Sequence, residues 1–325
     1  MTCCGPSVRS PRLATSALCA LAVWLASGCK SYPAPYTPPG PIEVAVTVDD
    51  LPRHGPNVPG LSRLELQQQL LTVLQKHHVP SVYGFVVGAK LLEHPEDKDV
   101  LGAWLSAGYP LGNHTYTHVD AEKVSAEDFL ASVVANESVL SGLMGPGTEK
   151  TWKVLRFPYL HEGADLEGRA VIRRVLQERG YRIAEVTVDF EDWAWNGPYA
   201  RCLAKGSPKA VQVLADSYLD AAMAHLRWSA DTAQRLFGAP IRHILLLHVG
   251  AFDAYMAEAL LTAYENAGVK WVTLDAALQD AVYKEEPRPA RSVRGPLLFQ
   301  VLRAREWRGF PIPASPEDML TLACQ

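Results

Sequence analysis

Short apolar runs of strand length alternate along the chain with longer amphipathic stretches. The runs are rich in β-branched and aliphatic residues, as strands buried on both faces of a parallel sheet are. They are Ile42–Val48, Ser81–Val87, Tyr109–Asn113, Lys153–Phe157, Ile183–Val188, His243–Leu247 and Val269–Leu274. We expect each of them to form a strand.

The stretches between these runs have the spacing of amphipathic helices. One side of the first stretch carries Leu64, Leu70, Leu71 and Leu74. A later stretch repeats the pattern with Phe129, Val133, Val134, Val139 and Leu140. Strand, helix, strand repeated about seven times over roughly 240 residues predicts an α/β fold with a parallel sheet, closed as a (β/α) barrel of about seven strands, short of the usual eight units.

The composition is that of an ordinary globular domain. Of 325 residues, 48% are hydrophobic and 20% are charged, so the chain can bury a large core. A net charge of −4 gives no electrostatic reason to expect nucleic acid or an anionic membrane surface as a partner. We therefore expect one main domain, at residues 42–285, and no nucleic-acid partner.

Residues 1–28 are expected to be a secretory signal. Arg9 and Arg12 precede an uncharged stretch, Leu13–Gly28, which at about 16 residues is too short to span a bilayer comfortably. Small residues before Cys29 resemble the cleavage box of bacterial lipoproteins, in which the cysteine is lipidated and anchors the protein to the membrane. A plain secretory signal with an incidental cysteine is the alternative. Both interpretations place the mature chain outside the cytoplasm, in the cell envelope if it is anchored.

Two segments flank the predicted domain. Residues 29–41 are rich in proline and are expected to form a stiff tether. Residues 286–325 lack a clear period and are expected to be a C-terminal appendage. Beyond the signal and Cys29, only Cys202 and Cys324 could pair. An oxidising compartment permits that disulfide without predicting it.

Polar residues follow the predicted strands one after another. The segments that follow the strands of a (β/α) barrel gather at one rim, so residues far apart in sequence meet there. Along the chain these residues are Asp49 and Asp50, His114 and His118, Arg156 to Tyr159, Asp189 to Trp193, and His248. An acidic pair with two histidines at i and i+4 is the ligand set of a hydrolytic metal site. The second carboxylate of the pair leaves a base for the proton of water.

In this order, five segments resemble the motifs of the polysaccharide deacetylase family, also called the NodB-homology family or carbohydrate esterase family 4. They are Thr47–Asp50, His114–His118, Arg156–Tyr159, Asp189–Trp193 and Leu246–His248. The resemblance covers about Ile42 to Val282. It implies a NodB-like distorted barrel that removes acetyl groups from N-acetylated or O-acetylated glycans with a divalent metal, most commonly zinc.

The resemblance also implies the roles of single residues. Asp49 would be the general base, and Asp50, His114 and His118 would bind the metal. His248 would be the general acid that protonates the leaving nitrogen.

The remaining motif residues would support these groups. Arg156 would brace the base, and Asp189 would orient the acid. The backbone N–H of Tyr159 would help to hold the oxyanion. Trp193 and Leu246 would form the wall of the pocket for the acetyl methyl group.

Each residue type has a structural alternative. An Asp-Asp pair after a strand often caps a helix or a turn, a lone histidine is often structural, and an arginine is often a salt-bridge partner. Seven further histidines lack a comparable constellation and are expected to be structural: His54, His77, His78, His94, His161, His225 and His243. Aromatic residues that could stack on sugar rings are Trp193, Trp195, Tyr199 and Trp228.

Three functions fit the sequence. The first is an exported, lipid-anchored, metal-dependent deacetylase of an acetylated glycan. The second is another C–N hydrolase on the same scaffold, acting on a small amide in a closed pit instead of an open groove. The third is a noncatalytic module that binds glycan or metal. We favour the first, because binding alone requires neither Asp49 nor the set of Arg156, Asp189 and His248.

Overall fold

The computed structural model describes residues 40–284, 294–307, 310–314 and 316–325. The predicted signal at 1–28, its Cys29 and nearly all of the tether at 29–41 lie outside the described residues, so these predictions stay predictions. The described residues all belong to one compact unit. Within this part of the chain, no helix is both long and apolar enough for a membrane span.

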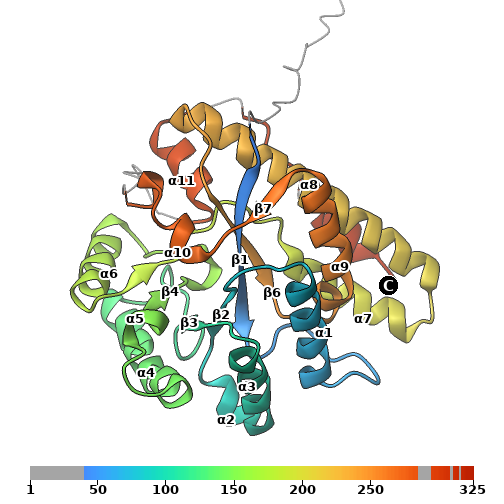
Figure 1. Ribbon diagram of the computed structural model, residues 1–325, viewed down its shortest axis with the longest axis horizontal. Helices are drawn as coiled ribbons and strands as arrows, with labels where there is room; N and C mark the ends of the chain where they lie inside the picture. Colours follow the sequence, from blue (N-terminus) through green and yellow to red (C-terminus); the bar gives the residue numbers. More distant parts are fainter. Residues whose placement is uncertain (1–39, 285–293, 308–309, 315) are drawn as a thin grey trace, which may run out of the picture. The chain divides into compact units, whose positions relative to one another are not determined.

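A seven-stranded sheet runs through the domain, with β1 near the centre of the view in Figure 1. Its strands are β1 (Ile42–Leu51), β2 (Tyr83–Val86), β3 (Leu111–Asn113), β4 (Val154–Leu155), β5 (Arg182–Ile183), β6 (His243–His248) and β7 (Val269–Trp271). Their order is β5-β4-β3-β2-β1-β6, and β7 pairs separately with β1. Every pairing is parallel. The predicted α/β class is confirmed.

The two edges of the curved sheet meet beyond β5, as expected for a distorted barrel. Val188 forms an isolated parallel bridge with Leu245 of β6. The predicted strand Ile183–Val188 is nevertheless interrupted, since β5 ends at Ile183. Beyond it, Thr187 Oγ1 accepts a hydrogen bond from the backbone N of Ile244 at 2.8 Å. This side chain takes a donor that a regular strand ladder would use.

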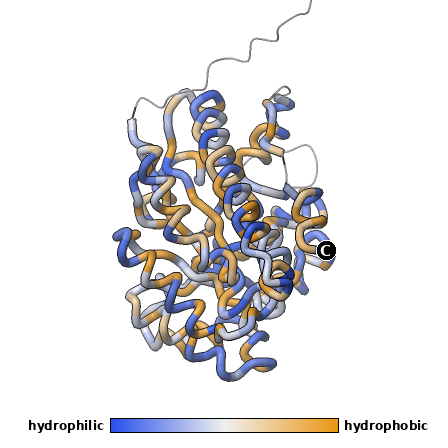
Figure 2. The backbone as a smooth tube through the Cα atoms, turned by 90° about the vertical axis from the view of Figure 1, so that its right-hand side faces the viewer, coloured by the Kyte–Doolittle hydropathy of each residue, from blue (hydrophilic) through white to orange (hydrophobic). Residues whose placement is uncertain are grey.

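Helices surround the sheet (Figure 1). They are α1 (Arg63–Lys76), α2 (Lys90–Glu93), α3 (Lys98–Ser106), α4 (Ala126–Met144), α5 (Glu149–Trp152), α6 (Leu166–Glu178), α7 (Asn196–Ala204), α8 (Pro208–Phe237), α9 (Ala251–Asn266), α10 (Leu274–Ala277), α11 (Leu297–Ala304) and α12 (Glu317–Leu322). Single turns of 3-10 helix occur at Pro95–Asp97, Pro158–Leu160, Asp192–Trp195 and Ala281–Tyr283. Figure 2 shows hydrophilic and hydrophobic positions alternating along the outer helices, as amphipathic helices require.

The helical predictions hold with one exception. Helix α1 begins at a capping box of Ser62 and Glu65 and buries Leu66, Leu70, Leu71 and Leu74. Helix α4 buries Phe129, Val133, Asn136 and Leu140. Val134 is 41% exposed, contrary to prediction. It lies five positions after Phe129, which at 100° per residue turns its side chain away from the buried face.

Alternation along β1 separates two buried faces. Val44, Val46 and Val48 belong to the main apolar cluster together with helix residues such as Leu70 and Leu71. Ala45 belongs to a second cluster, formed by residues of neighbouring strands such as Tyr83 and Phe85. Side chains two positions apart share a face of a strand. Thr47 and Asp49 therefore lie on the inner face, with Ala45.

The C-terminal residues pack against the domain. Leu298 and Leu302 of α11 are buried with Ala233, Leu236 and Ile241. Cys202 of α7 and Cys324 form a disulfide, which settles the pairing that the sequence left open. The predicted appendage is therefore, in its described part, joined to the domain by packing and by a covalent bond.

Candidate active site

A cavity of about 670 Å³ opens at the carboxyl ends of the strands. It brings together residues of every predicted motif. Those that line it are Asp49, Asp50, His114, His118, Tyr159, Asp189, Trp193, Leu246 and His248. Arg156 lies beneath them, fully buried and bonded to Asp49. The barrel-rim argument thus predicted which residues would meet.

Asp50, His114 and His118 form a possible metal site. Each offers one ligand atom, and these atoms lie within 4.8 Å of one another. Asp50 Oδ1 is 3.2 Å from His118 Nε2 and 3.7 Å from His114 Nε2. It is buried without a hydrogen-bond partner, although the ammonium of Lys90 is 3.4 Å away. A buried carboxylate oxygen left without a hydrogen bond between two imidazole nitrogens fits a cation ligand.

Hydrogen bonds orient the ligand side chains. His114 Nδ1 is 2.9 Å from the carbonyl oxygen of Arg156, which can only accept. Nδ1 must therefore carry the hydrogen, and the lone pair of Nε2 faces Asp50. On the other side, His54 Nδ1 donates to Asp50 Oδ2 at 2.7 Å.

The charges of the site match these roles. Burial lowers the pKa of His114 well below its usual value and also lowers that of His118, so both imidazoles are neutral, as metal ligands must be. Burial would raise the pKa of Asp50, but the His54 hydrogen bond and the Lys90 charge hold it well below the usual range. This carboxyl is therefore ionised.

Asp49 is buried beside the possible metal site and held by Arg156. Its Oδ1 accepts from Arg156 Nη1 at 2.9 Å, and its Oδ2 lies 3.7 Å from His114 Nε2. The same guanidinium donates to Thr47 Oγ1 at 3.0 Å and to the carbonyl of Ala184 at 2.7 Å. Burial raises the pKa of Asp49 to about 6, although the Arg156 charge opposes the shift. A carboxylate with a pKa near neutrality suits a general base.

His248 is oriented by Asp192, and the prediction that Asp189 orients it is wrong. Asp192 Oδ1 accepts from His248 Nδ1 at 2.8 Å, and its Oδ2 accepts from the backbone N of His248 at 2.6 Å. Burial opposes a charge on the ring, but the Asp192 carboxylate raises the pKa of His248 to about 10. Since Nδ1 is bonded to Asp192, Nε2 is the nitrogen left for the cavity.

The local backbone explains why Asp192 takes this place. Asp189 Oδ1 accepts from the backbone N of Glu191 at 2.9 Å, so its carboxylate is used within its own turn. Glu191 has a left-handed backbone (φ 61°, ψ 39°), which redirects the chain into the 3-10 turn that begins at Asp192. Burial raises the pKa of Asp189 to about 6. Asp189 lines the cavity, but Asp192 contacts the imidazole.

The other motif residues form the walls. Tyr159 has a left-handed backbone (φ 59°), and its half-exposed ring contacts the ring of His118 with a centroid distance of 4.6 Å. Leu246 and the 41% exposed Trp193 line the cavity. Trp195 and Tyr199 are buried, and Trp228 stacks on Phe299. Of the predicted aromatic platform, only Trp193 remains available to a sugar.

Four basic residues of the cavity were not predicted from the sequence. His54 and His161 were expected to be structural, yet both line the cavity. Their closeness to Asp50 and Tyr159 in sequence was the available signal. Arg294 and Arg303 also line it, from the predicted appendage, and no motif marks them.

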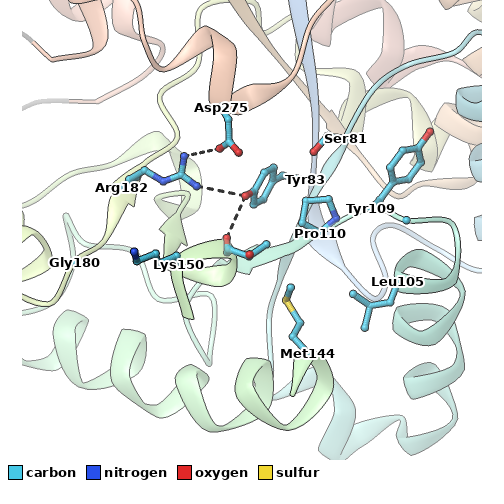
Figure 3. A pocket seen from close by; sticks show the side chains of 12 residues that line it. Ser81, Tyr83, Leu105, Tyr109, Pro110, Met144, Lys150, Gly180, Arg182 and Asp275 are labelled. Atoms are coloured by element: carbon cyan, nitrogen blue, oxygen red, sulfur yellow. Dashed lines mark hydrogen bonds and ion pairs between the residues drawn. The ribbon is translucent and has the colours of Figure 1, made fainter. Parts of the chain in front are cut away.

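A larger hollow of about 790 Å³ lies at the other ends of the strands (Figure 3). It is lined by residues at the starts of β2 and β5, including Tyr83 and Arg182. Tyr83 donates to the carbonyl of Thr151 at 3.2 Å, and Arg182 is paired with Asp275. Tyr83, Thr151, Arg182 and Asp275 thus bond to one another, and the lining includes none of the motif residues, so size alone does not make this hollow the site.

The family profile of polysaccharide deacetylases matches residues 37–184. This segment carries Asp49, Asp50, His114, His118 and Arg156. This segment of the chain belongs to the polysaccharide deacetylase family. The family predicted from the motifs is thereby confirmed.

Two curated proteins to which the chain is similar are both peptidoglycan-N-acetylglucosamine deacetylases from Bacillus cereus. One is 27% identical over 170 residues, which are 52% of this chain and 52% of the relative. The other is 25% identical over 128 residues, 39% of this chain and 43% of the relative. The chain thus spans about half the length, or less, of the curated relatives that it matches.

Solved structures share the fold. A carbohydrate esterase family 4 pseudoenzyme from Bacillus anthracis has a TM-score of 0.51 at 17% identity, covering 74% of this chain and 66% of its own. A mutant of this pseudoenzyme with restored enzymatic activity has a TM-score of 0.51 at 18% identity, covering 74% and 69%. At these identities the likeness shows the NodB-like fold alone. Since the fold occurs in both active and inactive proteins, the residues of the cavity carry the argument for activity.

Proposed function

We propose that this chain is an exported, metal-dependent hydrolase that removes N-acetyl groups from a glycan. The observation that carries the proposal is the meeting, in one cavity, of a possible Asp-His-His metal site with a braced carboxylate, Asp49, and a carboxylate-paired imidazole, His248. A protein that only binds glycan or metal needs neither of the last two groups.

Zinc is the metal that the donor set favours. One carboxylate and two imidazoles from Asp50, His114 and His118 are typical of catalytic zinc sites with three protein ligands. The hydrogen bond from His114 to the Arg156 carbonyl supplies the outer support that such ligands usually have. The chemistry that a divalent metal supplies in such a site is activation of water and polarisation of the bond under attack.

Asp49 and His248 carry the proton transfers of the proposed reaction. Asp49, fixed by Arg156, accepts a proton from the attacking water. His248, kept protonated by Asp192, donates a proton from Nε2 to the nitrogen of the departing amino sugar. Amide nitrogen is a poor leaving group unless it is protonated, so the acid matters as much as the base.

The walls of the cavity would orient the acetyl group. The backbone N–H of Tyr159 would donate to the oxyanion, as the family resemblance implies. Leu246 and Trp193 would enclose the methyl group in an apolar pocket. The exposed part of Trp193 would contact the sugar ring.

Export and lipidation of Cys29 belong to this proposal. The disulfide between Cys202 and Cys324 supports export, because disulfides persist in oxidising compartments outside the cytoplasm. The envelope is also where a membrane-anchored protein could meet an acetylated polymer.

Release of acetate from a panel of substrates tests the function. Residues 30–325 would be incubated with N-acetylated chito-oligosaccharides, peptidoglycan, O-acetylated xylan and small acetamides. We expect zinc-dependent acetate release from an N-acetylated glycan, and none from the Asp49→Asn variant. Turnover restricted to small amides would favour the alternative C–N hydrolase. No release from any substrate at full metal occupancy would favour a binding module.

A further inference from the structure

One wall of the active-site cavity comes from the C-terminal segment. Arg294, Gly295, Pro296 and Arg303 line the same cavity as Asp49 and His248. These residues lie far beyond the stretch 37–184 that matches the family profile. This wall is therefore a feature of this chain that the family match does not include.

Backbone hydrogen bonds hold this wall against the rim. Gly295 N donates to the carbonyl of Leu160 at 2.9 Å, next to the motif residue Tyr159. Leu297 N donates to the carbonyl of Val186 at 2.7 Å. Arg294 itself forms an antiparallel bridge with His161.

A buried polar contact adds to this attachment. Gln300 of α11 is 2% exposed, and its Nε2 donates to Glu162 Oε1 at 2.9 Å and to the carbonyl of Gly295 at 2.9 Å. Glu162 is 1% exposed and is also paired with Arg169 and Arg173. Together with the apolar face of α11, these contacts fix the position of the two cavity arginines.

The charges of the wall are incompletely compensated. Arg303 is exposed, and its Nη1 donates to the carbonyl of Arg294 at 2.8 Å. In the described part of the chain it has no acidic partner. Arg294 is 3.6 Å from Glu122, a loose pair whose side chains are 55% and 27% exposed. Besides the motif aspartates, Glu191 is the acidic residue that lines the cavity.

We propose that Arg294 and Arg303 form an anion subsite that selects acetylated glycans carrying an oxyanion, either a carboxylate or a phosphate. The proposal rests on the proposed function for the identity of the glycan, but not for the anion. A guanidinium presents a planar fork of donors that matches both oxyanions, and it remains charged at every physiological pH. An arginine held at a cavity wall without an acidic partner is available for such a contact.

Matched substrates test the subsite. Three oligosaccharides with the same N-acetylated backbone would be compared: a neutral one, one with 3-O-lactyl carboxylates and one with phosphate substituents. The wild type should show a lower KM for at least one anionic oligosaccharide than for the neutral one. Arg303→Gln should raise the KM for that substrate about tenfold and leave kcat and the neutral substrate unchanged. Arg303→Lys should lose part of the preference, because it keeps the charge without the fork.

Arg227→Gln is the matched control, since Arg227 is an exposed arginine of α8 that does not line the cavity. It changes net charge equally and should change no KM. Equal KM values for neutral and anionic substrates in the wild type, or an equal change for all substrates in Arg303→Gln, would overturn the proposal.

A binding measurement separates this proposal from the proposed function. Calorimetric affinity for the same oligosaccharides needs no turnover. One outcome would be that no acetate is released, but the wild type binds anionic oligosaccharides more tightly than the neutral one and Arg303→Gln does not. That result would support the subsite and contradict the proposed deacetylation. Acetate release without any Arg303-dependent preference for anionic oligosaccharides would support deacetylation and overturn the subsite.

Discussion

Asp192 binds His248 at two points, with one carboxylate oxygen on the imidazole Nδ1 at 2.8 Å and the other on the backbone N at 2.6 Å. The side chain and the strand end of the general acid are thus fixed by one fully buried carboxylate. Asp192 does not line the cavity, so its role is to position His248 and to raise its pKa.

Asp192→Asn should impair the acid without removing the metal. We expect kcat on an N-acetyl substrate to fall on the order of 10- to 100-fold. The variant loses the charge that raises the pKa of His248 to about 10. An acid must be protonated to act, so the alkaline limb of the pH–rate profile should move to lower pH.

Asp189→Asn is the control for this prediction. The Asp189 carboxylate is bonded within its own turn and only acts on His248 through its charge, so its replacement should move the alkaline limb less than Asp192→Asn does. Rates across pH and metal content for both variants check the assignment. A shifted limb in Asp189→Asn, with an unshifted one in Asp192→Asn, would restore the assignment made from the sequence.

Substitution of the adjacent residues Asp49 and Asp50 should impair activity in different ways. Asp49→Asn should keep its metal and lose the base, lowering turnover by a factor on the order of 10² to 10⁴. Asp50→Asn removes a ligand, so it should weaken metal affinity, and added zinc should restore part of its activity. His114→Ala should resemble Asp50→Asn. Elemental analysis with rate measurements distinguishes these results, and metal loss confined to Asp49→Asn would reverse the two roles.

Much of the fold could be predicted because buried parallel strands are continuous apolar runs. All the predicted strands exist, although β4 is only Val154–Leu155, and Leu274, the predicted end of the last strand, begins α10 instead. β5 ends at Ile183, and the chain beyond it meets β6 through Thr187, which bonds to the backbone N of a residue 57 positions away, a contact that no local pattern reveals. The predicted burial of Val134 was wrong for another reason. A valine one position away from the buried face fits a loose helical pattern equally well.

The motif positions were enough to predict which segments form the site, but not which side chains contact one another. Asp189 and Asp192 follow the same strand, and spacing alone cannot decide which carboxylate turns toward His248. The left-handed backbone of Glu191 decides it, and nothing in the residue type predicts that conformation. The position of Arg303 in the cavity wall could not be predicted for a different reason. It depends on how α11 packs against the domain, which includes the hydrogen bond between Gln300 and Glu162.

Cys29→Ser tests the proposed anchor. If Cys29 carries lipid, the wild type should partition into detergent and the variant should not, because the acyl chains would be the element that holds the protein to the membrane. Phase partitioning of cell fractions measures this, with Cys202→Ser as a cysteine control. A wild type already free of the membrane would leave the plain secretory signal as the interpretation.

The disulfide between Cys202 and Cys324 should stabilise the domain. It closes a loop over a sequence separation of 122 residues, and bonds of this kind contribute about 2 to 4 kcal/mol. Reduction should lower the urea midpoint of the wild type. The Cys202→Ala/Cys324→Ala double variant should have the lower midpoint with or without reductant. An unchanged wild-type midpoint after complete reduction would contradict a stabilising role.

Acid should destabilise the fold in part through His243. This residue is 2% exposed at the start of β6, and its Nδ1 is 3.2 Å from Thr187 Oγ1. Burial lowers its pKa from 6.5 to about 4. Between these values the unfolded chain binds a proton that the folded chain does not, so the free energy of unfolding decreases as pH falls. The contribution to stability is complete above pH 6.5 and is lost as pH falls toward 4.

His243→Gln removes this titration. Between pH 7 and pH 4, the free energy of unfolding of the wild type should fall by about 3 kcal/mol more than that of the variant, the equivalent of the pKa shift. Urea unfolding at several pH values measures the difference, whatever the variant's stability at pH 7. The exposed His78 provides the control, since His78→Gln should retain the wild-type slope. If His243→Gln lost stability with acid as steeply as the wild type, the proton uptake would have to occur at other residues.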